Sequence, residues 1–291
     1  MYYTGFADEA SPNLDVQIKA TKELGWKFIE TRKIGDSSLA FLDDKAFDDL
    51  CRKLAESGVS FNCFGSGIAN WAKPITESPE SSYDEMRKAV PRMQKLGIKM
   101  VRIMSFAVPK ELRGKDFFDE VVKRLKVIVK IAADGGITCV HENCMNWGSL
   151  NYDNTLRILD AVKSPNLKLV FDTGNPVSSD DVRGSGPYKK QSAWEFYNAV
   201  KDHVIYIHIK DGHCDSAKDK SVYTFPGEGD GDVKRILTDL FKRGYDGGIS
   251  IEPHMTSIFH EEGQDRKEKL CYENYVEYGR RIMKIVADCK K

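Results

Sequence analysis

The sequence predicts an α/β protein, a (β/α)₈ barrel formed by a single domain that spans residues 1–291. Short apolar segments alternate with longer helical segments along the chain, which is typical of parallel strands separated by helices. There are eight such apolar segments, the number that a closed barrel requires, and the length is near the ~250 residues typical of that fold. An open doubly wound sheet shows the same alternation, but the count and the length favour the barrel.

The expected strands follow one another in a regular pattern. In chain order they are MYYTGFAD, FIE, VSFNC, KMVRIM, CVHEN, LKLVFD, VIYIHI and GISIE. Five of them follow a helical segment that ends near a glycine, at Gly25, Gly58, Gly97, Gly136 and Gly244. Glycine suits the left-handed residue just past a helix end, so these positions predict helix ends followed by short turns into the next strand. The last helix is expected within ENYVEYGRRIMKIVADC.

The composition excludes several classes of protein. Lys plus Arg and Asp plus Glu each number 44, so no overall basic charge favours a nucleic-acid partner. Seven cysteines without a CxxC pair predict neither a disulfide framework nor a zinc knuckle. The sequence contains no run of about 18 apolar residues, so it predicts no membrane span. The first residues lack a signal-peptide pattern, so we expect a cytoplasmic protein, although a chain whose signal peptide had been removed would look the same. The sequence does not decide whether the protein forms a homo-oligomer.

Polar residues end four successive strands. Glu142, Asp172, His208 and Glu252 stand at the tips of the fifth to eighth strands. In a barrel the active site forms at these tips, so we expect the four side chains to converge. One acid alone would often be a helix cap, and one histidine alone a hydrogen-bonded barrel residue. Three carboxylates in one place would repel each other without a cation between them, which favours a single divalent metal. The donor types suit Mn²⁺, Mg²⁺, Co²⁺ or Zn²⁺, and we expect Mn²⁺.

At these residues the chain resembles the xylose isomerase-like TIM barrels, the superfamily of sugar isomerases and epimerases. The resemblance is strongest over residues 135–255 and rests on VHEN, FDTGN, HIKDG, PGEGDGD and GYDGGISIEPH, which occur in that order. It implies that Glu142, Asp172, His208 and Glu252 hold one divalent metal. It also implies that Glu142 and Glu252 form the acid–base pair.

Two departures from related families narrow the expected reaction. Asn175 stands where related apurinic-site endonucleases carry a histidine, and the chain has only six histidines, so a trinuclear phosphodiesterase centre is not expected. A second complete ligand set, as in two-metal hydride-transferring xylose isomerases, is not found. We therefore expect a sugar isomerase or epimerase that works by proton transfer through a metal-stabilised enediolate.

Other residues are candidates for the pocket around the metal. Those expected to contact a small-molecule sugar are Lys210, Trp71, Trp147, His254 and Glu228, with Glu30 a weaker candidate for a sugar hydroxyl. The alternatives are that Lys210 is a solvated loop lysine, that the two tryptophans pack inward, that His254 hydrogen-bonds within its loop and that Glu228 is a solvated turn acid. His141 either assists as a catalytic base or, because side chains alternate along a strand, packs against the helices. GSGIANW lacks the GK[ST] ending of a phosphate loop, which favours an unphosphorylated sugar.

The sequence leaves three alternative functions open. The first is a lyase that eliminates the substituent of a 3-keto-glycoside, with His141 assisting. The second is a phosphodiester hydrolase acting on damaged DNA, which Asn175 and the neutral net charge disfavour. The third is a non-catalytic sugar-binding protein on the same scaffold.

Overall fold

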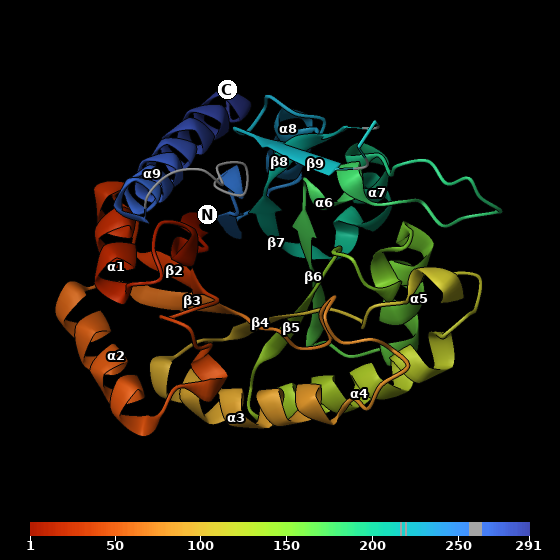
Figure 1. The fold of residues 1–291 in the computed structure, drawn as a ribbon, viewed down its shortest axis with the longest axis horizontal. Helices are drawn as coiled ribbons and strands as arrows, with labels where there is room; N and C mark the ends of the chain where they lie inside the picture. Colours follow the sequence, from red (N-terminus) through yellow and green to blue (C-terminus); the bar gives the residue numbers. More distant parts are fainter. Residues whose placement is uncertain (216, 219, 256–263) are drawn as a thin grey trace.

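Eight parallel strands form a nearly closed barrel surrounded by helices, which confirms the predicted fold class (Figure 1). The computed structural model describes residues 1–215, 217–218, 220–255 and 264–291. The barrel strands are β1 (Tyr2–Gly5), β2 (Phe28–Thr31), β3 (Ser60–Gly65), β4 (Met100–Ile103), β5 (Thr138–Glu142), β6 (Leu167–Asp172), β7 (Val204–Ile209) and β10 (Gly248–Ile251). They pair in the order β1-β10-β7-β6-β5-β4-β3-β2, so strands that follow one another in the chain are neighbours.

The seam of the barrel lies between β1 and β2. Within the described residues, a single parallel bridge from Phe6 to Glu30 joins these two strands. The other strand pairs form ladders, and the pair β6 and β7 places Asp172 beside His208. The register therefore brings two of the four polar tips next to each other.

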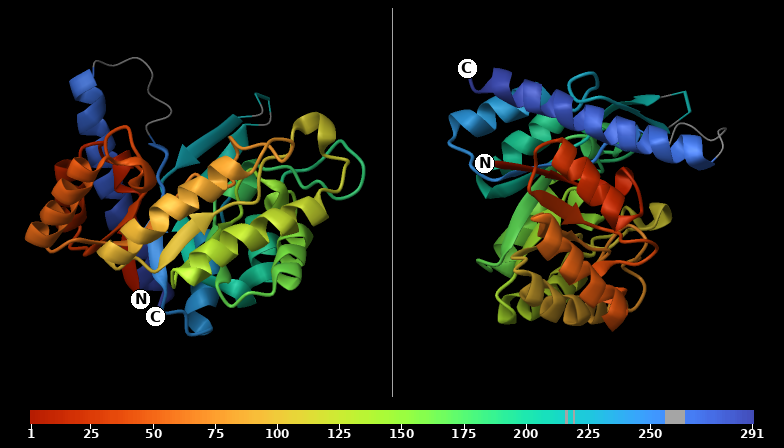
Figure 2. Two further views of the ribbon diagram at one scale, coloured as in Figure 1. Left: turned by 90° about the horizontal axis from the view of Figure 1, so that it is seen from below. Right: turned by 90° about the vertical axis from the view of Figure 1, so that its left-hand side faces the viewer.

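Helices cover the outside of the barrel. They are α1 (Leu14–Glu23), α2 (Asp44–Ser57), α3 (Glu80–Leu96), α4 (Phe118–Asp134), α5 (Tyr152–Val162), α6 (Asn175–Ser178), α7 (Ala193–Val200), α8 (Val233–Lys242) and α9 (Gln264–Cys289). Gly58 and Gly97 end α2 and α3 with φ of 71°, the left-handed conformation expected of glycine there. The long α9 lies against α1 and α8 (Figure 2). Among the described residues, no helix combines the length and apolarity that a membrane span requires.

An antiparallel hairpin follows β7 and was not expected from the sequence. It consists of β8 (Asp211–Asp215) and β9 (Lys220–Thr224), neither of which is among the eight strands expected from the sequence. Its first strand reads DGHCD and lacks the apolar alternation by which strands are usually detected. The hairpin brings Tyr223 to the mouth of the barrel.

The apolar core and the barrel interior differ in character. The main core lies between the strands and the helices, whereas a small apolar cluster of Cys63, Val140, Val170 and Tyr206 forms separately. Other side chains facing the interior are polar and fully buried, and they are Thr4, Glu30, His208 and Ser250. Buried polar groups require hydrogen-bond partners, so these interior side chains are expected to form a connected network that reaches the mouth of the barrel.

Candidate metal centre and active site

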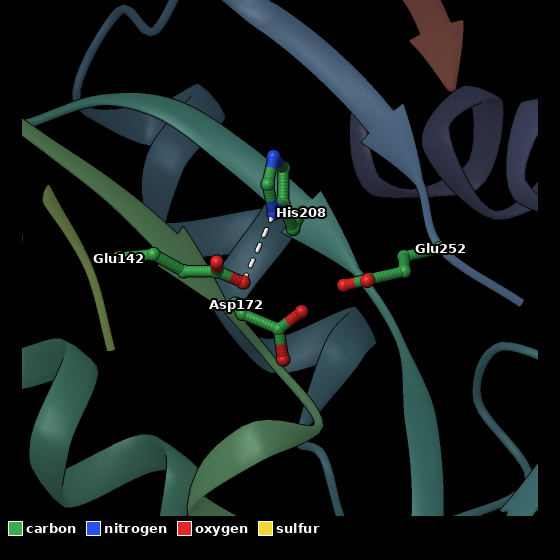
Figure 3. Close-up of side chains that lie close together, drawn as sticks. All are labelled: Glu142, Asp172, His208 and Glu252. Carbon is green, nitrogen blue, oxygen red and sulfur yellow. Dashed lines mark hydrogen bonds and ion pairs between the residues drawn. The ribbon is translucent and has the colours of Figure 1, made fainter. Parts of the chain in front are cut away.

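The four polar strand tips converge at the mouth of the barrel. Glu142 and Asp172 are the last residues of β5 and β6, His208 lies in β7, and Glu252 directly follows β10. All four are buried, and one ligand atom from each lies within 4.8 Å of the others. Glu142 and Glu252 point toward each other from opposite sides, with His208 and Asp172 between them (Figure 3).

The surroundings of the Asp172 carboxylate show whether a divalent cation fits among the four side chains. Its Oδ1 accepts hydrogen bonds from the backbone N–H of Gly174 (2.9 Å) and Asn175 (2.6 Å). Its Oδ2 is buried without a hydrogen bond within the described residues, although Lys210 Nζ lies 3.1 Å away. Burial raises the pKa of Asp172 to about 7; Lys210 opposes this rise, while the charges of neighbouring carboxylates add to it. A buried, unsatisfied carboxylate oxygen among other carboxylates and an imidazole suits a divalent cation, so these residues fit the metal that the fold implies.

His208 is held in place by Glu30. The imidazole Nε2 lies 3.0 Å from Glu30 Oε2, and Nδ1 lies 3.3 Å from Glu142 Oε1. Glu30 is fully buried and also accepts hydrogen bonds from Tyr206 (2.7 Å) and Ser250 (2.6 Å). Burial alone would lower the pKa of His208, but the carboxylates of Glu30 and Glu142 raise it to about 10, so the metal-free ring is an imidazolium that faces both. A cation bound among the four side chains would take the place of the proton on Nδ1, while Nε2 keeps its proton and donates it to Glu30. Glu30 therefore lies beneath the site, behind His208, rather than against a sugar hydroxyl.

Arg102 neutralises Glu142. Its Nη1 donates to Glu142 Oε2 at 3.1 Å, and its Nη2 donates to the carbonyl of Ser66 at 2.9 Å. Burial alone would raise the pKa of Glu142, but the charge of Arg102 and the contact with His208 lower it to about 2. Asn175, whose Nδ2 donates to the other oxygen of Glu142 at 3.2 Å, fixes the orientation of the same carboxylate.

Arg32 neutralises Glu252 in the same way. Its Nη1 donates to Glu252 Oε1 at 3.0 Å, while its Nε and Nη2 contact Asp8 and Glu9 at 2.8 and 3.2 Å. Glu9, Glu252 and His254 also lie close enough together to hold a metal. Arg32 already bridges the two carboxylates of that group, so its guanidinium provides the positive charge there.

Lys210 lies between the four candidate ligands and the pocket. Its side chain is buried, and its Nζ lies 2.9 Å from Glu252 Oε2. Although burial lowers the pKa of a lysine, the carboxylates of Asp172 and Glu252 raise that of Lys210 well above its usual value, so the side chain is an ammonium. Lys210 and His254 both line a cavity of about 680 Å³ above the metal centre. The exposed apolar side chains Phe41, Trp71 and Met145 line the same cavity.

Three residues expected near the substrate lie elsewhere. His141 faces away from the four ligands: a Cβ on Gly148 would stand 2.9 Å from its Nε2, so that glycine makes room for the ring. Burial lowers the pKa of His141 to about 4, and the ring is neutral. Trp147 is 2% exposed and packs beside Phe118 rather than lining the cavity. Glu228 is 54% exposed and pairs with Arg281 at 2.6 Å, outside the residues that line this cavity.

Sequence reasoning missed the residues that support the ligands. Arg32 and Arg102 are not recognisable as site residues from the sequence, because an arginine in or after a strand gives no sign of the carboxylate that it will meet. Asn175 was noted only for the histidine that it replaces, not for its contact with Glu142. The signal that could have identified the arginines is the need of buried carboxylates for countercharges.

The chain belongs to the family described as xylose isomerase-like TIM barrel, whose sequence model matches residues 18–274. Among curated proteins, an inosose dehydratase from Lactiplantibacillus plantarum is 27% identical over 148 residues, which cover 46% of this chain. The match spans 46% of that relative, so the chain corresponds to about half of its length.

Solved structures share the fold over nearly the whole chain. A xylose isomerase-like TIM barrel protein from Mycobacterium smegmatis, in complex with magnesium, is 18% identical with a TM-score of 0.66 and covers 94% of this chain and 88% of its own. D-psicose 3-epimerase from Clostridium cellulolyticum H10, with D-tagatose, is 13% identical with a TM-score of 0.69, and 100% of each chain is covered. At these identities the likeness shows the barrel fold.

Proposed function

We propose that the protein is a divalent-metal-dependent isomerase or epimerase of a sugar or sugar derivative, acting by proton transfer next to a carbonyl. The observation that carries this proposal is the group of Glu142, Asp172, His208 and Glu252 at the mouth of the barrel, with an unsatisfied oxygen on Asp172. The related structures that hold magnesium, or D-tagatose in an epimerase, lend support. Mn²⁺ and Mg²⁺ are the ions that three carboxylates favour, and a single imidazole admits Mn²⁺.

Each side chain has a part in this reaction. A divalent cation, when bound, polarises the sugar carbonyl and stabilises negative charge on its oxygen. Arg102 and Arg32 keep Glu142 and Glu252 ionised, so either carboxylate can accept the proton from the carbon beside the carbonyl. The two glutamates approach from opposite sides, which suits removal of the proton on one face and its return on the other. Lys210 donates a hydrogen bond to a substrate oxygen.

Elimination is a second candidate function. It begins with the same loss of a proton, after which a substituent on the next carbon leaves with the bonding electrons. The sequence relationship to a protein named inosose dehydratase favours this alternative, because dehydration is an elimination. His141 is turned away from the ligands in the structure, so a lyase of this form would rely on Glu142 or Glu252 as its base.

Deuterium exchange tests the proposal. The Mg²⁺-loaded protein is incubated in D₂O with ketoses, aldoses and 3-keto-glycosides, and ¹H NMR follows the carbons beside each carbonyl. We expect deuterium at one such carbon, with loss of the exchange in Glu142→Gln or Glu252→Gln. Release of a substituent would assign a lyase instead. Wild-type exchange in both variants with metal retained would refute the role of the two glutamates, and sugar binding without any exchange would leave a binding protein.

A further inference from the structure

Exposed apolar side chains gather at the mouth of the barrel. Within the described residues five large apolar side chains are exposed, and three of them, Phe41, Trp71 and Met145, line the cavity of about 680 Å³ over the four candidate ligands. They come from the segments between β2 and α2, between β3 and α3, and between β5 and α5. We call these three side chains the apolar rim. Apolar side chains that are grouped around a cavity, rather than scattered singly over the surface, mark a site for an apolar group.

The inner wall of the same cavity has the opposite character. Its lining includes the charged side chains of Arg102, Glu142, Lys210 and Glu252, all of which are buried. Each side chain of the apolar rim, in contrast, is more than half exposed. The lining therefore changes from buried and polar beside the candidate ligands to exposed and apolar at the mouth. A ligand that matches both ends carries hydroxyl and carbonyl oxygens on one side and an apolar group on the other.

The cavity has room for such a group beyond a sugar ring. Its volume lies within the range of about 300–1,000 Å³ that drug-sized ligands occupy, and a monosaccharide is smaller than such ligands. A second cavity of about 440 Å³ shares Trp71, Met145 and Tyr223 with the first, so part of the apolar rim lies where the two cavities meet. The space at the rim is therefore continuous with the space over the candidate ligands.

The residue types of the apolar rim favour an aromatic group over an alkyl chain. The rings of Phe41 and Trp71 gain from stacked or edge-on contact with another ring, beyond the gain from buried area alone. The thioether of Met145 makes favourable contacts with aromatic rings and adapts its shape to them.

We propose that Phe41, Trp71 and Met145 bind an aromatic substituent of the sugar derivative, while its sugar ring lies beside the four candidate ligands. This inference rests on the proposed function and deepens it by naming the substrate class, an aryl-substituted sugar. If the aryl group is joined through a glycosidic oxygen, the anomeric carbon carries no carbonyl. The carbonyl next to which the proton is removed then stands on another ring carbon.

Calorimetry with paired glycosides tests the inference. The Mg²⁺-loaded protein is titrated with the methyl and phenyl glycosides of D-glucose and D-galactose, each as the α and the β anomer. These glycosides carry no carbonyl, so they bind without reacting, and the ratio of Kd values within a pair reports the phenyl group. We expect the phenyl member of at least one pair to bind about tenfold more tightly, a difference of about 1.4 kcal/mol. Ratios below threefold in every pair, or no binding by any probe, would overturn the inference.

Variants locate the phenyl group in the structure. In Phe41→Ala/Met145→Ala the ratio should fall below threefold, while the affinity for the methyl glycoside stays unchanged. Trp71 is kept in this variant because an indole can also stack on the sugar ring itself. The matched control Val127→Ala/Ile205→Ala removes the other two exposed large apolar side chains of the described chain, which line neither cavity, and should keep the ratio. A wild-type ratio that survives in the Phe41/Met145 variant would contradict the proposed contact.

This inference and the proposed function fail separately. Deuterium exchange in an unsubstituted ketose or aldose, together with ratios below threefold, would overturn the aromatic substituent and keep the isomerase. A phenyl preference that depends on Phe41 and Met145, without exchange in any sugar, would overturn the isomerase and keep the aromatic binding site.

Discussion

The two halves of the barrel contribute different chemistry to the same site. Strands β5, β6, β7 and β10 carry the potential metal ligands, Glu142, Asp172, His208 and Glu252. The first half carries residues that hold those ligands: Glu30 in β2, Arg32 just after it and Arg102 in β4. Each of the three contacts a potential ligand that belongs to the other half.

We call the four potential metal ligands the reactive set. The supporting set consists of Glu30, Arg32 and Arg102. The C-terminal half concentrates negative charge, which alone would be costly to bury. The two arginines from the N-terminal half offset that charge, and Glu30 fixes the orientation of the imidazole. The bridge between Phe6 and Glu30 lies at the seam, so the supporting set also joins the two ends of the barrel. Substitutions in the two halves should therefore produce different losses of stability and of metal affinity.

The largest effect is expected from Arg102→Met. The substitution leaves Glu142 as a buried charge without its cation, which typically costs about 3–5 kcal/mol in the free energy of unfolding. Saturating Mg²⁺ should recover part of this loss, because the ion supplies positive charge beside the same carboxylate. Urea denaturation with and without Mg²⁺ measures both values. Arg52→Met, which removes an exposed arginine from α2, is the control and should change little. An equal loss with and without Mg²⁺ would contradict an ion next to Glu142.

Asp172→Asn tests the reactive set with little structural disturbance. The asparagine Oδ1 can still accept the hydrogen bonds from Gly174 and Asn175, but the charge of the ligand is lost. Metal affinity should fall by about 100-fold or more, beyond the losses usual for outer partners of a metal site. Calorimetric titration with Mn²⁺ measures the affinity, and Asp134→Asn on the surface of α4 is the matched control. Retention of wild-type Mn²⁺ affinity would remove Asp172 from the ligand set.

Glu30→Gln tests the supporting set. Glutamine keeps the size of the side chain but removes the charge that orients His208, so metal affinity should fall by about 10- to 100-fold. Titration with Co²⁺, followed by the visible absorption of the ion, reports both its affinity and its coordination geometry. A purely structural role of Glu30 would leave that absorption spectrum unchanged. Tyr206→Phe removes one hydrogen bond to Glu30 but keeps the ring that packs edge-on against His208, and it should have a smaller effect. Equal losses in the two variants would argue that Glu30 acts through stability alone.

The sequence predicted the fold and the four converging tips for a clear physical reason. Alternating segments and strand ends are local patterns, and parallel strands place their ends at one edge. The supporting set depends instead on contacts between distant positions, such as Arg32 with Glu252, 220 residues apart, and Glu30 with His208, 178 residues apart. No local pattern specifies such partners, because each arises only when the barrel closes.

Burial of the loop tryptophans was equally beyond local reasoning. Trp71 and Trp147 both follow barrel strands, yet Trp71 is 57% exposed in the mouth and Trp147 is 2% exposed. The packing of Trp147 beside Phe118, at the start of α4, decides the difference. Hydrophobicity is the same for both residues, so only the tertiary structure separates them.

Of these substitutions, Trp71→Ala should have the smallest effect. It tests the substrate pocket, whereas the other substitutions test the reactive and supporting sets. An exposed indole ring contributes packing area to a sugar, about 0.5–1.5 kcal/mol, so KM for the sugar that exchanges deuterium should rise about 2- to 12-fold. The value of kcat should stay constant, since Trp71 is not one of the four candidate ligands and its loss weakens ground and transition states alike. Val127→Ala, an exposed apolar residue of α4, is the control for loss of surface hydrophobicity. A fall in kcat with unchanged KM would instead place the indole at the reacting carbons, and would extend the reactive set to the N-terminal half of the barrel.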